Sequence, residues 1–165
     1  MIPIKDQIPT RHIPVINYLL IAANIVVFII MYFSGANEEA LVYQFALIPA
    51  NVTAGIDLGD ISDVFTSMFM HAGIAHILGN MLYLWIFGDN VEDSMGPVKY
   101  LSFYLVGGVV ASLAHILTNP GSQIPTVGAS GAIAAVLGAY LVLYPQSRVL
   151  TIIPLGFFMR MTLVP

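Results

Sequence analysis

Strongly apolar stretches alternate with polar segments along the chain. The first runs from Val15 to Phe33 and is interrupted only by Asn17 and Asn24. With about 1.5 Å of rise per residue, a helix of this length matches the bilayer hydrocarbon core, about 30 Å thick. The pattern therefore predicts a first membrane span here, after an extended leader over residues 1–14.

The second apolar stretch lasts from Val64 to Phe87 and is longer than one span. We expect the helix itself to start close to Ala75, with residues 64–73 as a lead-in at the membrane interface. The polar residues that follow Phe87 end the stretch.

Two further spans are predicted, over residues 100–117 and 126–144, joined by the turn Asn119-Pro120-Gly121-Ser122. Residues 15–165 thus form one membrane domain. Its predicted fold is all-α, a polytopic membrane helix bundle with about four spans.

Two segments do not fit a span. Residues 35–63 are acidic and predict a long loop, partly structured by apolar islands such as residues 45–49. Residues 149–165 are apolar but contain Pro154 and Arg160, and an arginine inside a span costs about 2.5–3.5 kcal/mol. This last segment is predicted to be an interfacial hairpin or a re-entrant stretch.

The composition excludes several classes of protein. Hydrophobic residues make up 58% of the chain and charged residues only 8%, which excludes an ordinary soluble domain and makes lipid the expected surroundings. Five Lys and Arg against nine Asp and Glu, without a basic run, exclude a nucleic-acid binder. Without cysteine there is no disulfide, thiolate metal site or cysteine nucleophile.

The few positive charges predict the orientation. Lys5 and Arg11 precede the first span, Lys99 lies between the second and third, and Arg148 follows the fourth. All these segments fall on one side, which the positive-inside rule makes cytoplasmic. The N-terminus is then cytoplasmic, and the acidic loop lies outside.

Three polar residues lie in or just before the second span, namely His71, His76 and Asn80. Polar groups inside a membrane need partners within the protein, so they mark candidate sites. His76 and Asn80 are four residues apart and share one helix face. The simpler interpretation is that they join helices by hydrogen bonds.

A serine between glycines begins the fourth span, in Gly128-Ala129-Ser130-Gly131. Taken alone, such a serine is usually a packing residue, but its glycine neighbours leave the hydroxyl accessible. Gly131, Ala135 and Ala139 also form a face of small residues on which another helix can pack.

The topology brings these features to the same depth, because the second and fourth spans both descend from the outside. His76 and Asn80 side chains directed at a carbonyl beside Ser130 would act as an oxyanion hole. A base that takes the serine proton is missing.

Three motifs, His71-Ala-Gly-Ile-Ala-His76-Ile-Leu-Gly-Asn80, Glu92-Asp-Ser-Met-Gly96 and Gly128-Ala-Ser130-Gly131, occur in this order. Together they resemble the rhomboid intramembrane serine proteases. The resemblance implies that Ser130 is the nucleophile, that His76 and Asn80 form the oxyanion hole with the Ser130 amide, and that His71 supports the site. Glu92 and Gly96 would be structural. No metal or organic cofactor is implied.

The chain also departs from the family pattern. The general base of the family is a histidine on a sixth span, and none of His12, His71, His76 and His115 occupies that place. We expect the last two spans to be missing and the chain as given to be inactive. His115 is the one candidate replacement, although a polar helix end is the simpler interpretation. The family's Trp-Arg pair in the first outer loop is also absent.

The leading hypothesis for the complete protein is therefore a serine endopeptidase of a bacterial cytoplasmic membrane. It would cleave transmembrane protein substrates with a Ser-His dyad. The alternative is a non-catalytic rhomboid-like protein that binds membrane clients. A channel or transporter is less favoured, because the sequence has no repeat symmetry. Nor do Asp57, Asp60 and Asp63 indicate a metal site, since such spacing is typical of a solvated acidic face.

Overall fold

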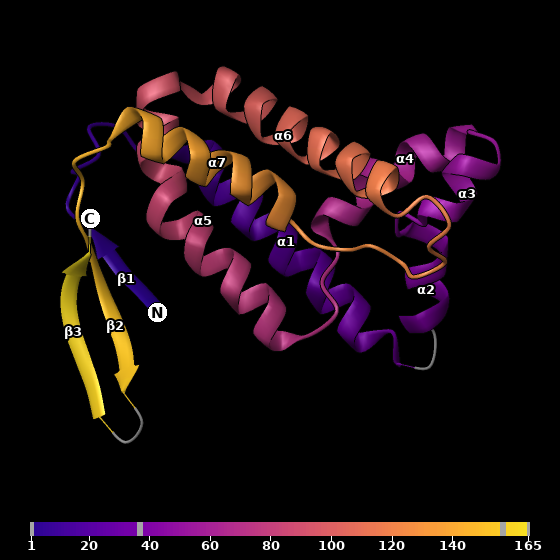
Figure 1. Ribbon diagram of the computed structural model, residues 1–165, viewed down its shortest axis with the longest axis horizontal. Coiled ribbons are helices and arrows are strands. Elements are labelled where there is room, and N and C mark those ends of the chain that lie inside the picture. The colour runs from indigo at the N-terminus through magenta and orange to yellow at the C-terminus, as the bar shows by residue number, and fades with distance from the viewer. Residues whose placement is uncertain (1, 36–37, 156–157, 165) are drawn as a thin grey trace.

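The computed structural model describes residues 2–35, 38–155 and 158–164. Four long helices pack as one bundle, with short helices at one end and a small sheet at the other (Figure 1). We call these the loop end and the sheet end. The elements are β1 (Ile2–Asp6), α1 (Val15–Phe33), α2 (Glu38–Phe45), α3 (Pro49–Ala54), α4 (Leu58–Thr66), the 3-10 helix η2 (Ser67–Phe69), α5 (Ile74–Met95), α6 (Pro97–Thr118), α7 (Ser130–Leu143), β2 (Val149–Leu155) and β3 (Phe158–Val164).

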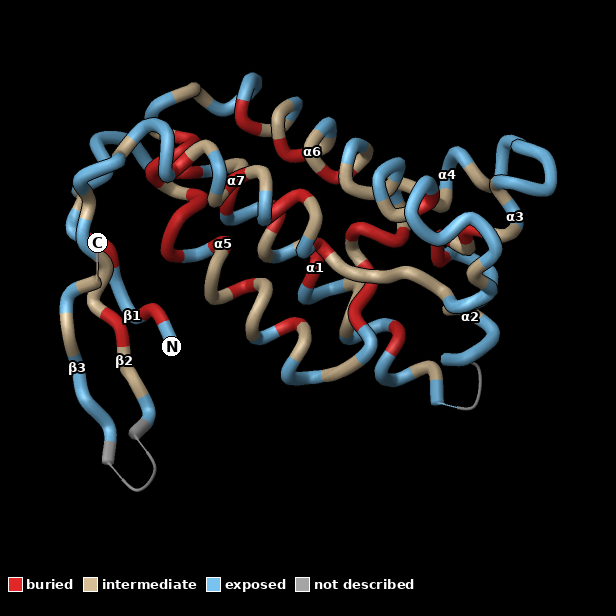
Figure 2. Tube along the Cα trace, in the orientation of Figure 1, coloured by how far each residue is buried: buried red, intermediate tan, exposed pale blue. Residues whose placement is uncertain are grey.

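Helix α7 contacts both α5 and α6 and carries much of the core. Ala132, Ile133, Val136 and Tyr140 are its buried residues. Figure 2 shows buried positions where the long helices face one another and exposed positions along their outer sides. Large apolar side chains such as Ile30 of α1, 62% exposed, lie on those outer sides, as lipid surroundings require.

The predicted helical membrane bundle is confirmed, with differences in its spans. By length and composition, α1 and α6 can each cross a membrane, and Leu58–Phe69 with Ile74–Met95 would make a third span, bent by 81°. Helix α7 has only 14 residues. It starts at Ser130 rather than at Thr126, because the residues before Ser130 are bonded to other segments. The Thr126 N–H donates to the Leu47 carbonyl.

A carboxylate of α5 holds the start of α1. Glu92 is 4% exposed and accepts hydrogen bonds from the backbone N–H groups of Ile16, at 3.1 Å, and Asn17, at 2.7 Å. The first N–H groups of a helix lack partners within it, so this buried carboxylate serves as the cap. Because Glu92 finds partners inside the protein, α5 continues past Phe87 to Met95. The structural role implied for Glu92 is confirmed.

Helices α6 and α7 approach each other through small residues. A β-carbon on Gly131 would lie 2.5 Å from that of Ala111, and one on Gly107 would lie 2.6 Å from that of Ala135. Real β-carbons do not come so close, so these glycines allow the backbones to meet. The predicted small-residue face of the fourth span is therefore the contact with α6.

The leader and the last segment form one antiparallel sheet, in the order β1-β2-β3. Ile2 pairs with Ile152, which in turn pairs with Met161. The segment predicted as an interfacial hairpin or a re-entrant stretch thus contains, in its described part, the antiparallel strands β2 and β3. The extended leader adds a third strand to the otherwise helical fold. This sheet lies beside the end of α5 (Figure 1).

The acidic loop contains the helices α2, α3 and α4. Asp57 and Asp60 form a capping box at the start of α4, in which each side chain accepts a hydrogen bond from the other residue's backbone N–H. Ala46 and Leu47, in the apolar island, are buried. The loop is therefore a folded part of the loop end, close to the start of α7.

Candidate functional site

The segment before α7 is held in an extended form that brings Ser130 to the start of a helix. The Gly128 N–H donates to the Ser67 carbonyl at 2.8 Å, and the Thr126 N–H donates to the Leu47 carbonyl at 2.8 Å. Gly128 has a φ of +126°, a backbone conformation that residues other than glycine rarely adopt. Ser130 is the first residue of α7 and is exposed.

Gly128 packs directly against the polar face of α5. A β-carbon on Gly128 would lie 2.8 Å from both Cε1 and Nε2 of His76 and 3.7 Å from Nδ2 of Asn80. His76 and Asn80 are half-buried. The structure thus brings His76 and Asn80 of α5 together with the glycine that lies two residues before Ser130.

His71 lies behind these two side chains. It is 1% exposed, and its Nε2 is 2.8 Å from the Asn80 amide nitrogen. The rings of His71 and His76 meet edge to face, with centroids 4.9 Å apart. Both histidines therefore belong to one polar cluster with Asn80.

A cavity of about 200 Å³ opens beside Ser130. Ser67, Ser112, His115 and Thr126 supply polar groups to its wall. The sequence singles out His115, as a candidate replacement base or a polar helix end, but not the other three residues. Their place in the sequence gives no motif, because residues of η2, of α6 and of the turn before α7 meet only in the fold.

The hydrogen bonds of the histidine rings do not include Ser130. Within the described parts of the chain, the ring bonds made by His12, His71 and His115 go to Asp93, Asn80 and Asn119. Ser130 and His115 share a cavity without such a bond. The described residues therefore bring together a serine and candidate oxyanion donors, but no serine-histidine hydrogen bond.

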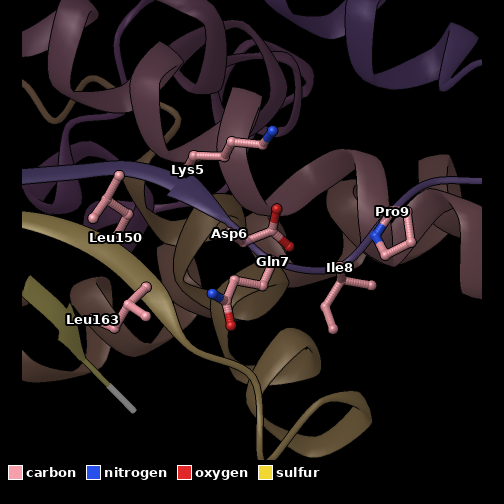
Figure 3. Close-up of a pocket in the computed structure, with 7 residues that line it drawn as sticks. All are labelled: Lys5, Asp6, Gln7, Ile8, Pro9, Leu150 and Leu163. Atoms are coloured by element: carbon pink, nitrogen blue, oxygen red, sulfur yellow. The ribbon is translucent and has the colours of Figure 1, made fainter.

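A second cavity, of about 720 Å³, lies away from this cluster at the sheet end (Figure 3). Leu150 and Leu163 line one part of it, and Lys5 and Asp6 line another. The Asp6 carboxylate accepts hydrogen bonds from Asn90 at 2.6 Å and from the Tyr140 hydroxyl at 3.0 Å. Burial raises the pKa of Asp6, and the hydrogen bond from Tyr140 partly opposes that rise.

No group of three or more His, Cys, Asp or Glu residues that could hold a metal ion occurs in the described ranges. The carboxylates of Asp57 and Asp60 are engaged in the capping box. The polar side chains that the structure gathers beside the Gly128 turn are those of histidine and asparagine.

Comparison with known proteins finds a matching family model and several relatives. The family model for the rhomboid domain matches residues 58–164. The chain is 35% identical over 137 residues to the rhomboid protease GluP of Bacillus subtilis. The matched residues make up 82% of this chain and 26% of GluP. It is 28% identical over 131 residues to the putative rhomboid protease YdcA of the same organism, covering 79% of this chain and 63% of YdcA.

A mitochondrial relative also matches. The human presenilin-associated rhomboid-like protein is 30% identical over 141 residues, which cover 84% of this chain and 35% of that protein. The chain thus spans between about a quarter and two thirds of the length of these relatives. The matched region contains His71, His76, Asn80 and Ser130. This chain belongs to the rhomboid family, which includes intramembrane serine proteases.

Proposed function

We propose that the protein is an intramembrane serine endopeptidase in which Ser130 is the nucleophile. The observation that carries the proposal is the contact of Gly128 with His76 and Asn80. It supports the proposal because the His76 and Asn80 side chains, which can both donate hydrogen bonds, lie close to the turn that leads into Ser130. Family membership supports the same reaction.

In the proposed reaction, the Ser130 hydroxyl oxygen attacks the carbonyl carbon of a substrate peptide bond. The carbonyl oxygen becomes an oxyanion, which His76, Asn80 and the Ser130 backbone N–H would stabilise by hydrogen bonds. Removing one such donor typically lowers kcat by about 100- to 1,000-fold. The Ser130 proton needs an acceptor that returns it to the leaving amine, and water then hydrolyses the acyl-enzyme.

The family resemblance assigns the acceptor role to a histidine on a sixth span, and none of the four histidines of the sequence matches that position. Activity is therefore proposed for the protein expressed from its native gene. Within the described residues, the proposal assigns roles to Ser130, His76, Asn80 and the glycines Gly128 and Gly131. His71 has a supporting role.

We propose transmembrane proteins as the substrates and lipid as the surrounding medium. All five Lys and Arg residues are in segments at the sheet end: Lys5, Arg11, Lys99, Arg148 and Arg160. The positive-inside rule then makes the sheet end and the N-terminus cytoplasmic, so Ser130 lies toward the outer surface. The proposed location is a bacterial cytoplasmic membrane, and reporter fusions to the N-terminus test the orientation.

The test is cleavage of a tagged model transmembrane substrate by membranes that contain the protein expressed from its native gene. Ser130→Ala should abolish the product. The matched control is Ser102→Ala, since Ser102 is a serine of α6 whose hydroxyl donates to the Val98 carbonyl. Ser102→Ala should retain cleavage. Unchanged cleavage by Ser130→Ala would refute the proposal.

A second candidate function is client binding without cleavage. The absence of a histidine bonded to Ser130 among the described residues favours it. A client-binding protein would co-purify with an intact transmembrane segment and yield no product, and Ser130→Ala would bind as well as the wild type. The same cleavage assay, with recovery of the bound substrate, separates the two functions.

A further inference from the structure

The His71 ring is directed at Asn80 and buried away from solvent. It follows η2 and precedes α5, and only 1% of the residue is exposed. Its Nε2 is 2.8 Å from the Asn80 amide nitrogen. A buried polar ring with a single side-chain partner has a defined orientation, and it fixes the orientation of that partner in turn.

The chemistry of this contact selects one tautomer. An amide nitrogen can only donate a hydrogen bond, so the Nε2 atom of His71 must accept and carry no proton. The proton of the neutral ring is then on Nδ1, which is buried. The His71 ring is therefore a neutral acceptor.

The hydrogen bond leaves Asn80 with one further N–H. An amide nitrogen has two hydrogens, and His71 takes one of them. The same nitrogen is 3.7 Å from the position of a β-carbon on Gly128, so it lies beside the turn that precedes Ser130. A rotated Asn80 amide would present its carbonyl oxygen there instead, and a carbonyl cannot stabilise an oxyanion.

We infer that His71 is a positioning residue, which holds the Asn80 amide with its free N–H toward the Gly128–Ser130 turn. The inference rests on the proposed function, because it assigns Asn80 as an oxyanion donor. His71 also contacts the His76 ring edge to face, so it supports the second donor by packing. These two effects can be separated by substitution.

Two substitutions separate hydrogen bonding from packing. His71→Phe keeps a ring against His76 but has no acceptor for Asn80, whereas His71→Gln restores an acceptor oxygen. In the protein expressed from its native gene, we expect His71→Phe to lower kcat by roughly 10- to 100-fold with KM nearly unchanged. His71→Gln should recover part of kcat. His12→Phe, the same change at an exposed histidine, should keep kcat.

The outcomes distinguish the inference from the proposed function. If Ser130→Ala cleaves normally, the proposed function fails. If Ser130→Ala is inactive while His71→Phe keeps the wild-type kcat, or while His71→Gln is no better than His71→Phe, only the role of His71 is overturned.

A second measurement does not need activity. Nitrogen NMR of wild-type protein with isotope-labelled histidine rings reports the tautomer. The His71 signals are those that disappear in His71→Gln. A protonated Nδ1 and an unprotonated Nε2 are expected. A protonated Nε2 would overturn the inference even if the phenylalanine variant fails to fold.

Discussion

Gly128 lies so close to His76 that a β-carbon on the glycine would come within 2.8 Å of the imidazole. Gly128→Ala should therefore displace His76 or the turn before Ser130, and its φ of +126° adds backbone strain. We expect cleavage by the protein from its native gene to fall at least about 100-fold, the scale of losing one oxyanion donor. Initial rates on a transmembrane substrate measure this.

The matched control is Gly121→Ala, because a β-carbon on Gly121 meets no atom within 4 Å. This variant should cleave at nearly the wild-type rate. A Gly128→Ala protein that is folded and equally active would contradict the proposed contact between the turn and the oxyanion donors.

A larger side chain where α6 packs on α7 should lower the stability of the fold without changing the residues of the candidate site. Gly107→Ala places a β-carbon 2.6 Å from that of Ala135, which must force the helices apart. Overpacking of this kind costs about 1–3 kcal/mol. Thermal unfolding in detergent micelles should show a lower Tm. Gly138→Ala, on the open side of α7, should leave Tm nearly unchanged or raise it slightly.

Glu92 should be a strong determinant of stability. Glu92→Ala leaves the N–H groups of Ile16 and Asn17 buried without their acceptor, at a cost of about 2–3 kcal/mol. Glu92→Gln keeps one acceptor oxygen and should lose less. The exposed Glu39 provides the control variant Glu39→Ala. Equal unfolding midpoints for Glu92→Ala and Glu39→Ala would contradict the capping role.

The stability of the fold should depend on pH through the carboxyl of Asp6 at the sheet end. Burial raises the pKa of its carboxyl above the ordinary value of 3.8. Since the folded pKa exceeds the unfolded one, the contribution of Asp6 favours folding at low pH and is lost as the pH rises through the folded pKa. Asn90 and Tyr140 donate to the same oxygen, Oδ2, so asparagine at this position can still accept both bonds.

Asp6→Asn should therefore have a higher Tm than the wild type at neutral pH, with a difference that shrinks as the pH falls toward 3.8. Unfolding curves in micelles across this range measure it. The control Glu38→Gln changes an exposed carboxylate and should show no such trend. A lower Tm for Asp6→Asn at neutral pH would show that ionised Asp6 stabilises the fold.

Much of this fold follows from local patterns in the sequence. The apolar run from Val15 to Phe33 coincides with α1, because a lipid-facing helix needs a continuous apolar sequence of that length. The boundaries near polar residues were less predictable. α5 passes Phe87 because Glu92 finds its partners in α1, a contact between residues far apart in the sequence.

The candidate site was predictable in its motifs and less so in its geometry. The spacing of His76 and Asn80 places them on one helix face, and the glycines around Ser130 mark a close approach. The cavity that Ser67, Ser112 and His115 share with Ser130 could not be predicted, since these residues come from separate elements. Nor does the sequence pattern show that the leader pairs with β2.

The most direct test of the central claim is labelling with a fluorophosphonate, which forms a covalent bond with activated serines. The protein expressed from its native gene is treated in membranes, and the modified peptide is identified by mass spectrometry. The account predicts an adduct on Ser130 that is absent from the heat-denatured protein. Ser112 and Ser67, in the same cavity, should remain unmodified. An unmodified Ser130 in a folded protein would contradict its role as the nucleophile.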